Sequence, residues 1–306
     1  TSARTGKPID QRAIDNVVQE IKQDIDTQEA RRVYDTPSKG VLWGWEVTAY
    51  VWTKAIATGT FLMIAVWIWL NGGINAASEM NGLLTSLVFM GITGALLVKD
   101  LDRPDRFLYV ILRPQWKSWL VRGAYIIMGF SGLITIKLFD SYFGWGFSWL
   151  MIPGSMLAIL GAVYTAFLFG QARGRDLWQS TVLSAVHMLV HAVMAGSVAM
   201  MVIAPETSAW MANVLLWGII LNLCIIAKEI LMPHDTPDTR KAIHLMTKGY
   251  YSKYFWAGIV FGSITPIVMI NTYADTMTLI AGGMALVGIF LTEFVRIRVP
   301  QMIPLS

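Results

Sequence analysis

The chain has 306 residues, of which 55% are hydrophobic and only 14% are charged, and its mean hydropathy is +0.53. A soluble domain carries about 25% charged residues because its surface must be solvated. This composition therefore excludes an ordinary soluble globular protein. It predicts an integral membrane protein whose surroundings are a lipid bilayer, with no nucleic acid among its partners. The thirteen Trp and ten Tyr residues suit aromatic belts at the two membrane interfaces.

A single cysteine, Cys224, limits the redox chemistry that the chain can support. An internal disulfide, an iron–sulfur cluster and a covalently attached c-type haem each need more thiols. We therefore expect no iron–sulfur cluster and no covalently attached haem in this chain. Cys224 lies in an apolar run, which predicts a small buried hydrophobic residue.

Residues 1–42 differ in character from the rest of the chain. Residues 1–40 hold seven basic and seven acidic side chains and no long apolar run. Apolar residues recur at helical spacing, which predicts an amphipathic helix over residues 9–33. The pattern lacks the apolar core and small-residue cleavage site of a secretory signal. We expect a cytoplasmic tail that lies on the protein or membrane surface, or one that docks a partner subunit.

Apolar stretches long enough to cross about 30 Å of hydrocarbon follow one another from Trp43 onward. None shows the alternation of a barrel strand, so each is predicted to be a helix. The expected spans are residues 46–70, 77–98, 116–138, 149–170, 180–203, 209–232, 252–272 and 276–295. Turn or charge signals such as Asn71-Gly72-Gly73 and Gly144-Trp145-Gly146 separate them.

The basic residues of the connections gather on one side of the predicted membrane protein. That side holds the tail, the second, fourth and sixth connections and the C-terminal end, whereas the other side has Lys137 and little else. By the positive-inside rule, both termini are predicted to be cytoplasmic.

Ionisable residues inside membrane spans are costly, so each is a functional candidate. They are Glu46, Lys54, Arg122, His187, His191, Lys228, Glu229, Glu293 and Arg296. Lys228, Glu229 and Arg296 lie near span ends, where they can extend toward the interface. Lys54, His187 and His191 lie deeper and are stronger candidates.

His187 and His191 are four residues apart and share one face of a helix. A haem held between two imidazoles normally takes one imidazole from each of two helices. The other two histidines, His234 and His244, both lie in a polar connection, so this pattern disfavours a haem. A metal site would need Glu293 or Glu229 as a further ligand. Two interpretations stay open for this pair: histidines satisfied by packing, or a proton relay.

Two further clusters border the predicted cytoplasmic side. Trp43-Gly44-Trp45-Glu46 and Tyr50 place aromatic and acidic groups at the start of the first span. The second connection, residues 99–107, packs six charges and a proline into nine residues. A solvated loop explains such a run, but a pocket at a bundle end lined by Tyr, Trp, Arg and carboxylates would also suit a quinone, an amphipathic ring with polar carbonyls.

At these residues the sequence resembles the NrfD family, the membrane subunits typified by polysulfide reductase and alternative complex III. Four stretches carry the resemblance, which covers roughly residues 43–306. They are Trp-Gly-Trp-Glu with Tyr50 and Gly59-Thr60; Asp-Leu-Asp-Arg-Pro-Asp-Arg-Phe with Leu-Val-Arg-Gly-Ala-Tyr; Tyr164-Thr165-Ala166-Phe167; and residues 299–306 at the tail.

The resemblance implies an all-α membrane domain of eight helices in two four-helix bundles, residues 43–172 and 178–306. It implies a haem-free anchor, with menaquinone or ubiquinone in the first bundle and electrons exchanged with a docked ferredoxin-like iron–sulfur subunit. A further catalytic or cytochrome subunit and a bacterial inner membrane are also expected.

Residue by residue, the resemblance assigns the quinone pocket and its rim to Glu46, Tyr50, Asp100, Arg103, Arg122 and Tyr164, and we add Trp45 and Lys54 from their place in the first span. Glu46 or Asp100 would act as the base that accepts protons from a quinol. His187, His191, Lys228, Glu229 and Glu293 become candidates for proton movement in the second bundle.

Two other functions fit the same residues. A secondary transporter or ion channel would use the buried Lys, His and Glu side chains, although Pro266 in the seventh span has no counterpart in the third. A purely structural anchor would simply pair these charges with each other.

Overall fold

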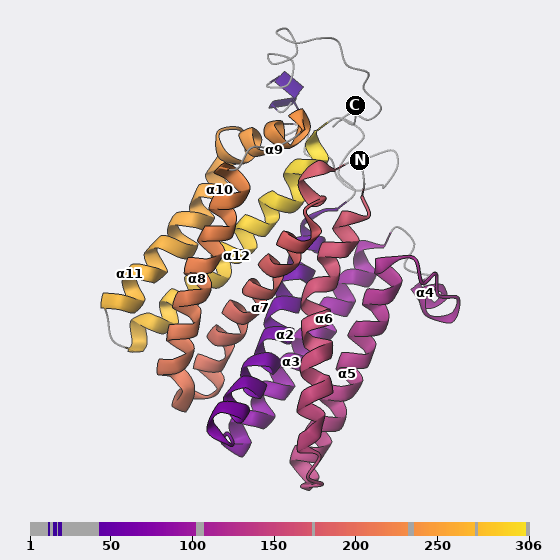
Figure 1. Cartoon of the computed structure of the whole chain (residues 1–306), viewed down its shortest axis with the longest axis vertical. Coiled ribbons are helices and arrows are strands. Elements are labelled where there is room, and N and C mark those ends of the chain that lie inside the picture. The colour runs from indigo at the N-terminus through magenta and orange to yellow at the C-terminus, as the bar shows by residue number, and fades with distance from the viewer. Residues whose placement is uncertain are drawn as a thin grey trace.

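The structure is a computed structural model that describes residues 12, 15–16, 18–19, 43–101, 107–172, 175–231, 236–272 and 275–303. Within these ranges every regular element is helical (Figure 1). The predicted amphipathic helix over residues 9–33 lies almost entirely outside the described residues, and so does Arg103.

Eight helical segments are long and apolar enough to cross a membrane, as the sequence predicts. The fold class, an all-helical membrane protein with eight spans, is therefore confirmed. The helices are α2 (Trp45–Asn71), α3 (Ala76–Asp100), α4 (Phe107–Leu112), α5 (Trp119–Phe143), α6 (Met151–Gly170), α7 (Thr181–Ile203), α8 (Ser208–Leu231), α9 (Pro237–Thr247), α10 (Ser252–Ile259), α11 (Thr265–Thr272) and α12 (Asp275–Arg298). The short helices α4 and α9 lie in connections, and α10 and α11 together form the seventh span.

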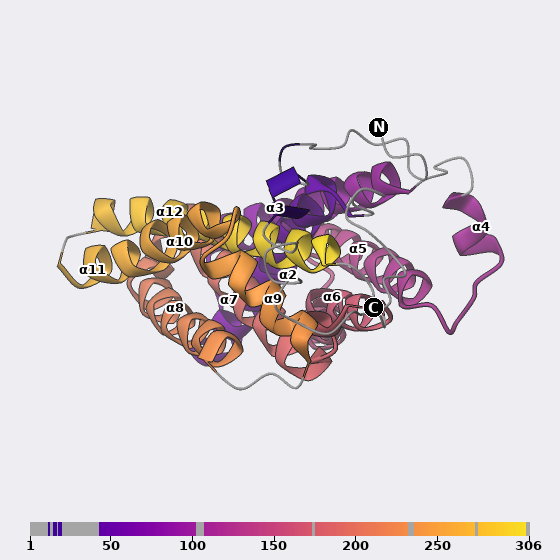
Figure 2. The same ribbon diagram turned by 90° about the horizontal axis from the view of Figure 1, so that it is seen from above.

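The spans pack as two groups of four joined along α2 and α7. In the first group α2, α3, α5 and α6 form a closed ring, and in the second α7, α8, α10–α11 and α12 do the same. Helix α2 packs against α3, α6, α7 and α12, so it lies at the centre of the molecule (Figures 1 and 2). The ends of the helices near α4 and α9 form one face of the bundle, which we call the charged end because it carries the basic connections.

Turn residues end the spans where the sequence predicts. Gly72, with φ of 76°, ends α2, and Gly144, with φ of 69°, ends α5. Both adopt the left-handed conformation that glycine reaches without a steric cost.

The expected end of the third span near residue 138 is wrong by about one turn, because α5 continues to Phe143. Lys137 therefore lies inside the helix and not at its end. Its Nζ lies 2.6 Å from Asp140 Oδ2 and 3.0 Å from Glu79 Oε1, and both Lys137 and Asp140 are buried. Paired charges can stay inside a bundle where a single charge could not.

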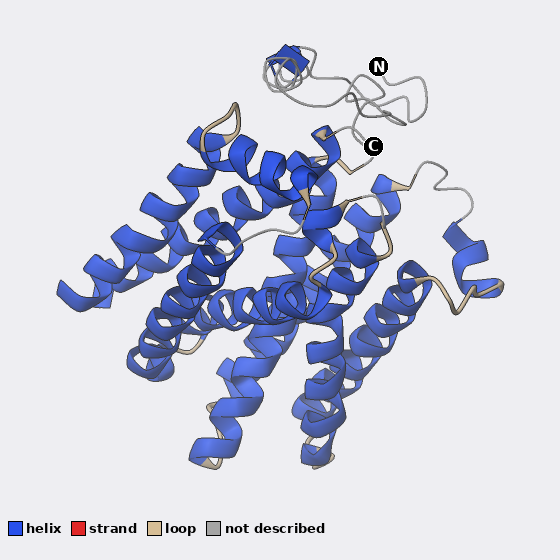
Figure 3. Cartoon of the chain, turned by 45° about the horizontal axis from the view of Figure 1, so that its top comes forward, coloured by secondary structure: helices blue, strands red, loops and turns tan. Residues whose placement is uncertain are grey.

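The seventh span is interrupted by a π-helical turn, Val260–Ile264. Pro266 has no N–H to donate to the carbonyl four residues earlier, and the widened turn bonds Thr265 N–H to Val260 O instead. The turn also brings Gly262 against Gly288 of α12. A Cβ added to Gly262 would lie 2.2 Å from Gly288 Cα. The seventh and eighth spans therefore pack backbone to backbone at this level. Figure 3 shows these helices with the others, and no strand, in the described part of the chain.

Candidate functional site

A cleft of about 270 Å³ opens at the charged end among the helices of the first group. Its lining residues are Trp43, Val47, Tyr50, Leu97, Asp100, Leu101, Leu120 and Leu168. Tyr50 is 2% exposed, so its side chain is held in place within the cleft wall. Two of the residues predicted from the sequence, Tyr50 and Asp100, thus supply polar groups to an otherwise mostly apolar hollow.

Glu46 and Trp45 lie at the start of α2, one turn before Tyr50, and both meet Lys99 from the end of α3. Lys99 Nζ is 3.9 Å from Glu46 Oε1 and 4.6 Å from the centre of the Trp45 ring. Trp45 is 49% exposed, and the Lys99 side chain is 58% exposed. Such an exposed pair contributes little stability. The contact places a carboxylate and an aromatic ring at the start of α2, one turn from Tyr50.

Lys54 lies one turn deeper in α2 and is completely enclosed. Its Nζ donates a hydrogen bond to Thr165 Oγ1 and sits 4.3 Å from the centre of the Tyr164 ring. Lys54 and Tyr164 are each 1% exposed. The Tyr164 hydroxyl is buried with no hydrogen-bond partner among the described residues. The structure therefore places Tyr164 and Lys54 together behind the cleft rather than in its wall.

Arg122 is not part of this group in the structure. The side chain is exposed on the first turn of α5, where Nε donates to Trp116 O at 2.6 Å and the guanidinium lies 4.8 Å from the Trp119 ring centre. A role in the pocket stays a prediction for Arg122, and it would need contact with a molecule that reaches beyond the cleft.

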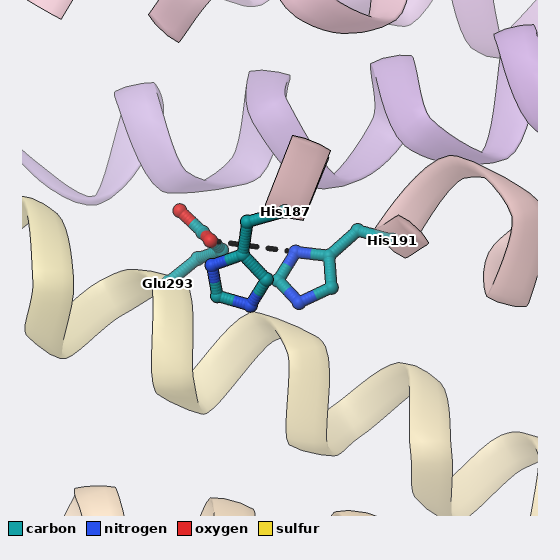
Figure 4. A group of neighbouring side chains, drawn as sticks. All are labelled: His187, His191 and Glu293. Carbon is teal, nitrogen blue, oxygen red and sulfur yellow. Dashed lines mark ion pairs between the residues drawn. The ribbon is translucent and has the colours of Figure 1, made fainter. Parts of the chain in front are cut away.

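The second group of ionisable residues lies where α7, α8 and α12 meet. Figure 4 shows Glu293 of α12 directed at His187 and His191 of α7. His191 Nδ1 is 3.3 Å from Glu293 Oε1, and all three residues are at most 1% exposed. These three side chains could reach a common metal ion. However, Arg296 lies against two of them, and a guanidinium would repel a cation, so we assign no metal to them.

Asn222 and Arg296 complete this group, and the sequence analysis gave neither this role. Asn222 Oδ1 lies 2.6 Å from His187 Nε2 and 3.0 Å from His191 Nε2. Arg296 Nη1 lies 2.5 Å from His187 Nδ1 and 3.1 Å from Glu293 Oε1. The i, i+3 spacing of Glu293 and Arg296 was the available signal, together with an asparagine in the middle of an apolar span.

The interpretation of the residues near span ends is partly wrong. Arg296 does not extend to the interface: it is 9% exposed, and its Nη2 lies 3.0 Å from Glu229 Oε1 on α8. Lys228, in contrast, is exposed, as expected for a residue that reaches toward the interface.

Cys224 is also exposed rather than buried. It faces outward from α8, where lipid accepts an apolar side chain as readily as a protein core does.

The polar residues near the cleft and those on α7, α8 and α12 approach each other across the contact between α2 and α7. Gly59 of α2 and Gly196 of α7 meet backbone to backbone, since a Cβ added to either would fall within 2.2 Å of the opposite chain. Lys54 of α2 is close enough to Glu293 for the two charges to act on each other.

A comparison with protein families gives a match to the polysulphide reductase model, NrfD, over residues 35–304. The chain belongs to the NrfD family. No curated protein matches the chain. NrfD proteins are membrane subunits of quinone-linked, multi-subunit oxidoreductase complexes.

The NrfD-like stretches noted in the sequence converge on the charged end of the fold. Apart from Gly59-Thr60 in the middle of α2, their described residues occupy the start of α2, the end of α3, the start of α5, the end of α6 and the short 3₁₀ helix Val299–Met302. Gln301 binds the backbone of Trp43, accepting from its N–H at 2.9 Å and donating to its carbonyl at 3.1 Å. The C-terminal end of this NrfD protein therefore holds one wall of the cleft in place.

Proposed function

We propose that this NrfD protein is the quinone-binding membrane anchor of an electron-transfer complex, with the cleft beside Tyr50 as its quinone site. The observation that carries the proposal is the cleft itself: a hollow at the charged end that combines apolar walls with a buried phenol and a carboxylate. The family supports the same class of function.

The lining residues fit the head group of menaquinone or ubiquinone. Leu97, Leu120, Leu168 and the Trp43 ring offer apolar contact to a substituted ring and the start of its tail. The Tyr50 hydroxyl can donate a hydrogen bond to a ring oxygen. Quinol oxidation releases two protons with two electrons, and Asp100 in the wall or Glu46 beside it is placed to accept one.

The electrons would pass to or from a partner, because one cysteine cannot hold an iron–sulfur cluster. A ferredoxin-like iron–sulfur subunit would dock at the charged end, near the exposed Trp45 and Lys99. A further catalytic or cytochrome subunit would complete the complex. The charged end would face the cytoplasm, with both termini on that side, because it carries the excess of basic residues, and the membrane would be a bacterial inner membrane.

The buried group on α7, α8 and α12 would carry protons. His187, His191, Glu293 and Arg296 form a continuous set of polar contacts that ends at Glu229, near the charged end. Lys54 lies between this set and the cleft, as its contacts with Thr165 and Tyr164 and its proximity to Glu293 indicate. Protons released at the cleft would thus have a neighbouring polar route.

Quinol-dependent turnover of the intact complex tests the site. Tyr50→Phe and Asp100→Asn should each lower turnover at least tenfold, because each removes one polar group from the cleft wall while conserving its shape. Tyr142→Phe is the matched control, since Tyr142 is 71% exposed at the opposite end of α5. Unchanged turnover in both cleft variants would exclude this cleft as the quinone site.

Co-purification in mild detergent separates this function from the alternative of a secondary transporter. A multi-cysteine iron–sulfur protein recovered in stoichiometric amount supports the anchor. Recovery of this chain alone, or only with copies of itself, would favour transport through the buried Lys, His and Glu residues instead.

A further inference from the structure

Three of the four ring nitrogens of His187 and His191 are hydrogen-bonded, and the fourth, His191 Nδ1, has no hydrogen-bond partner among the described residues although it lies close to Glu293. A neutral imidazole has one N–H donor and one acceptor nitrogen, whereas an arginine guanidinium only donates and an amide oxygen only accepts. Each contact made by these two rings therefore restricts where a proton can be.

Arg296 determines the state of His187. Because Arg296 Nη1 lies 2.5 Å from His187 Nδ1 and can only donate, Nδ1 must be the acceptor. His187 is then neutral with its proton on Nε2, which donates to Asn222 Oδ1 at 2.6 Å. This contact also fixes the orientation of the Asn222 amide: with its NH₂ group turned to His187, the ring would have to accept at both nitrogens.

The same oxygen determines one side of His191. Asn222 Oδ1 lies 3.0 Å from His191 Nε2, so this nitrogen must also carry a proton. His191 Nδ1 then faces Glu293 Oε1 at 3.3 Å. A neutral His191 opposite an ionised Glu293 would bring a nitrogen lone pair against a carboxylate oxygen, with both residues 1% exposed. Two buried acceptors in contact are unfavourable, and one proton between them removes the conflict.

We infer that His191 and Glu293 form a proton-binding site that holds one exchangeable proton between Nδ1 and Oε1. The proton resides on the imidazole, giving an imidazolium beside a carboxylate, or on the carboxyl group, giving a carboxylic acid beside a neutral imidazole. This site gives the proton movement proposed above a specific location, and its functional role rests on that proposed function. The presence of the proton can be measured without quinone or a partner subunit. This inference and the proposed function can therefore fail independently of each other.

The charged and titratable groups that face the pair come from α2, α7, α8 and α12. On α12 and α8, Arg296 lies between Glu293 and Glu229 and can neutralise only one of these two carboxylates. On α7 the nearest titratable group is His187, which the contacts above hold neutral. On α2, Tyr50 and Lys54 also act on Glu293, and the Lys54 ammonium group is bonded to Thr165 and faces the Tyr164 ring.

Nuclear magnetic resonance of ¹⁵N-histidine in the full chain, reconstituted in lipid, tests the site. The sequence has four histidines, so a His234→Ala, His244→Ala background leaves only His187 and His191. We expect His187 as a neutral ring protonated on Nε2. We expect His191 either doubly protonated or protonated on Nε2 with an infrared band from a buried carboxylic acid.

Glu293→Gln should remove this proton, because an amide can donate to Nδ1 and needs no shared proton. The imidazolium signal or the carboxylic-acid band should disappear, a loss of one proton per chain. Glu206→Gln makes the same chemical change at the other end of the bundle and should leave both spectra unchanged. The inference would be overturned by His191 carrying its only proton on Nδ1, or by two neutral histidines with no carboxylic-acid band. The first spectrum needs no variant at Glu293, so the test holds even if Glu293→Gln fails to fold.

Discussion

The close approach of α2 and α7 gives a quantitative prediction for Gly59→Ala. A Cβ at Gly59 would lie 1.8 Å from Ala192 O and 2.8 Å from Gly196 N. Ordinary van der Waals contact begins near 3.4 Å, so the two backbones must separate by about 1.6 Å at this level. A gap of 0.5–1 Å already forfeits roughly a quarter to a half of the dispersion energy of the lining atoms.

The cost should lie at the upper end of the usual range for overpacking, about 3 kcal/mol, because backbone atoms cannot rotate away from a clash. The better helix propensity of alanine offsets roughly 1 kcal/mol of this cost. Thermal unfolding of the purified chain in mild detergent measures the net effect. With roughly 2–4 °C per kcal/mol, we expect the midpoint to fall by about 4–8 °C.

Gly91→Ala on α3 is the matched control for this prediction. A Cβ at Gly91 meets no heavy atom within 4 Å, so this variant gains helix propensity without a clash and should melt at or slightly above the parent. If Gly59→Ala unfolded at the same temperature as Gly91→Ala, the backbone contact between α2 and α7 would be refuted.

Three further substitutions test the polar contacts. Arg296→Met should lower the free energy of unfolding by about 3–5 kcal/mol, because it leaves buried carboxylates without their cation. Adding Glu229→Gln should recover part of the lost thermal stability, and no recovery would contradict the pairing of Arg296 with Glu229. Gln301→Ala should cost about 1–3 kcal/mol in the same unfolding assay, since two hydrogen bonds to the Trp43 backbone are lost. Lys137→Met should lower the unfolding temperature by a similar or larger amount than Gln301→Ala, because two carboxylates lose their buried partner, and a neutral result would place those groups in water.

The sequence predicted several of the residues that the structure brings together, but not the full membership of either group. Tyr50 and Asp100, which the resemblance assigns to one pocket, line one cleft, and His187 and His191 meet Glu293, one of the two carboxylates named in the sequence analysis as a possible neighbour. Asn222 escaped notice because an uncharged amide in an apolar span gives a weak signal.

The direction in which each side chain points was the part that the sequence could not supply. Arg296 and Arg122 both lie near the ends of their spans, yet Arg296 turns into the bundle toward two carboxylates and Arg122 turns out toward tryptophans. Distance from a span end decides only whether an arginine can reach water. The partners on other helices decide which way it turns, and they are set by the packing.

The sequence by itself determined that this protein crosses the membrane eight times and which end collects the basic residues, because hydropathy and charge act locally along the chain. Only the tertiary structure decided which span is central. The first span has a mean hydropathy of 1.5 and is 78% buried, whereas the sixth has a mean hydropathy of 2.1 and is 33% buried. Lipid is as apolar as a protein core, so hydropathy does not distinguish the two environments. Helix α2 is central because its glycine and its small and hydroxyl-bearing residues let four helices pack closely against it.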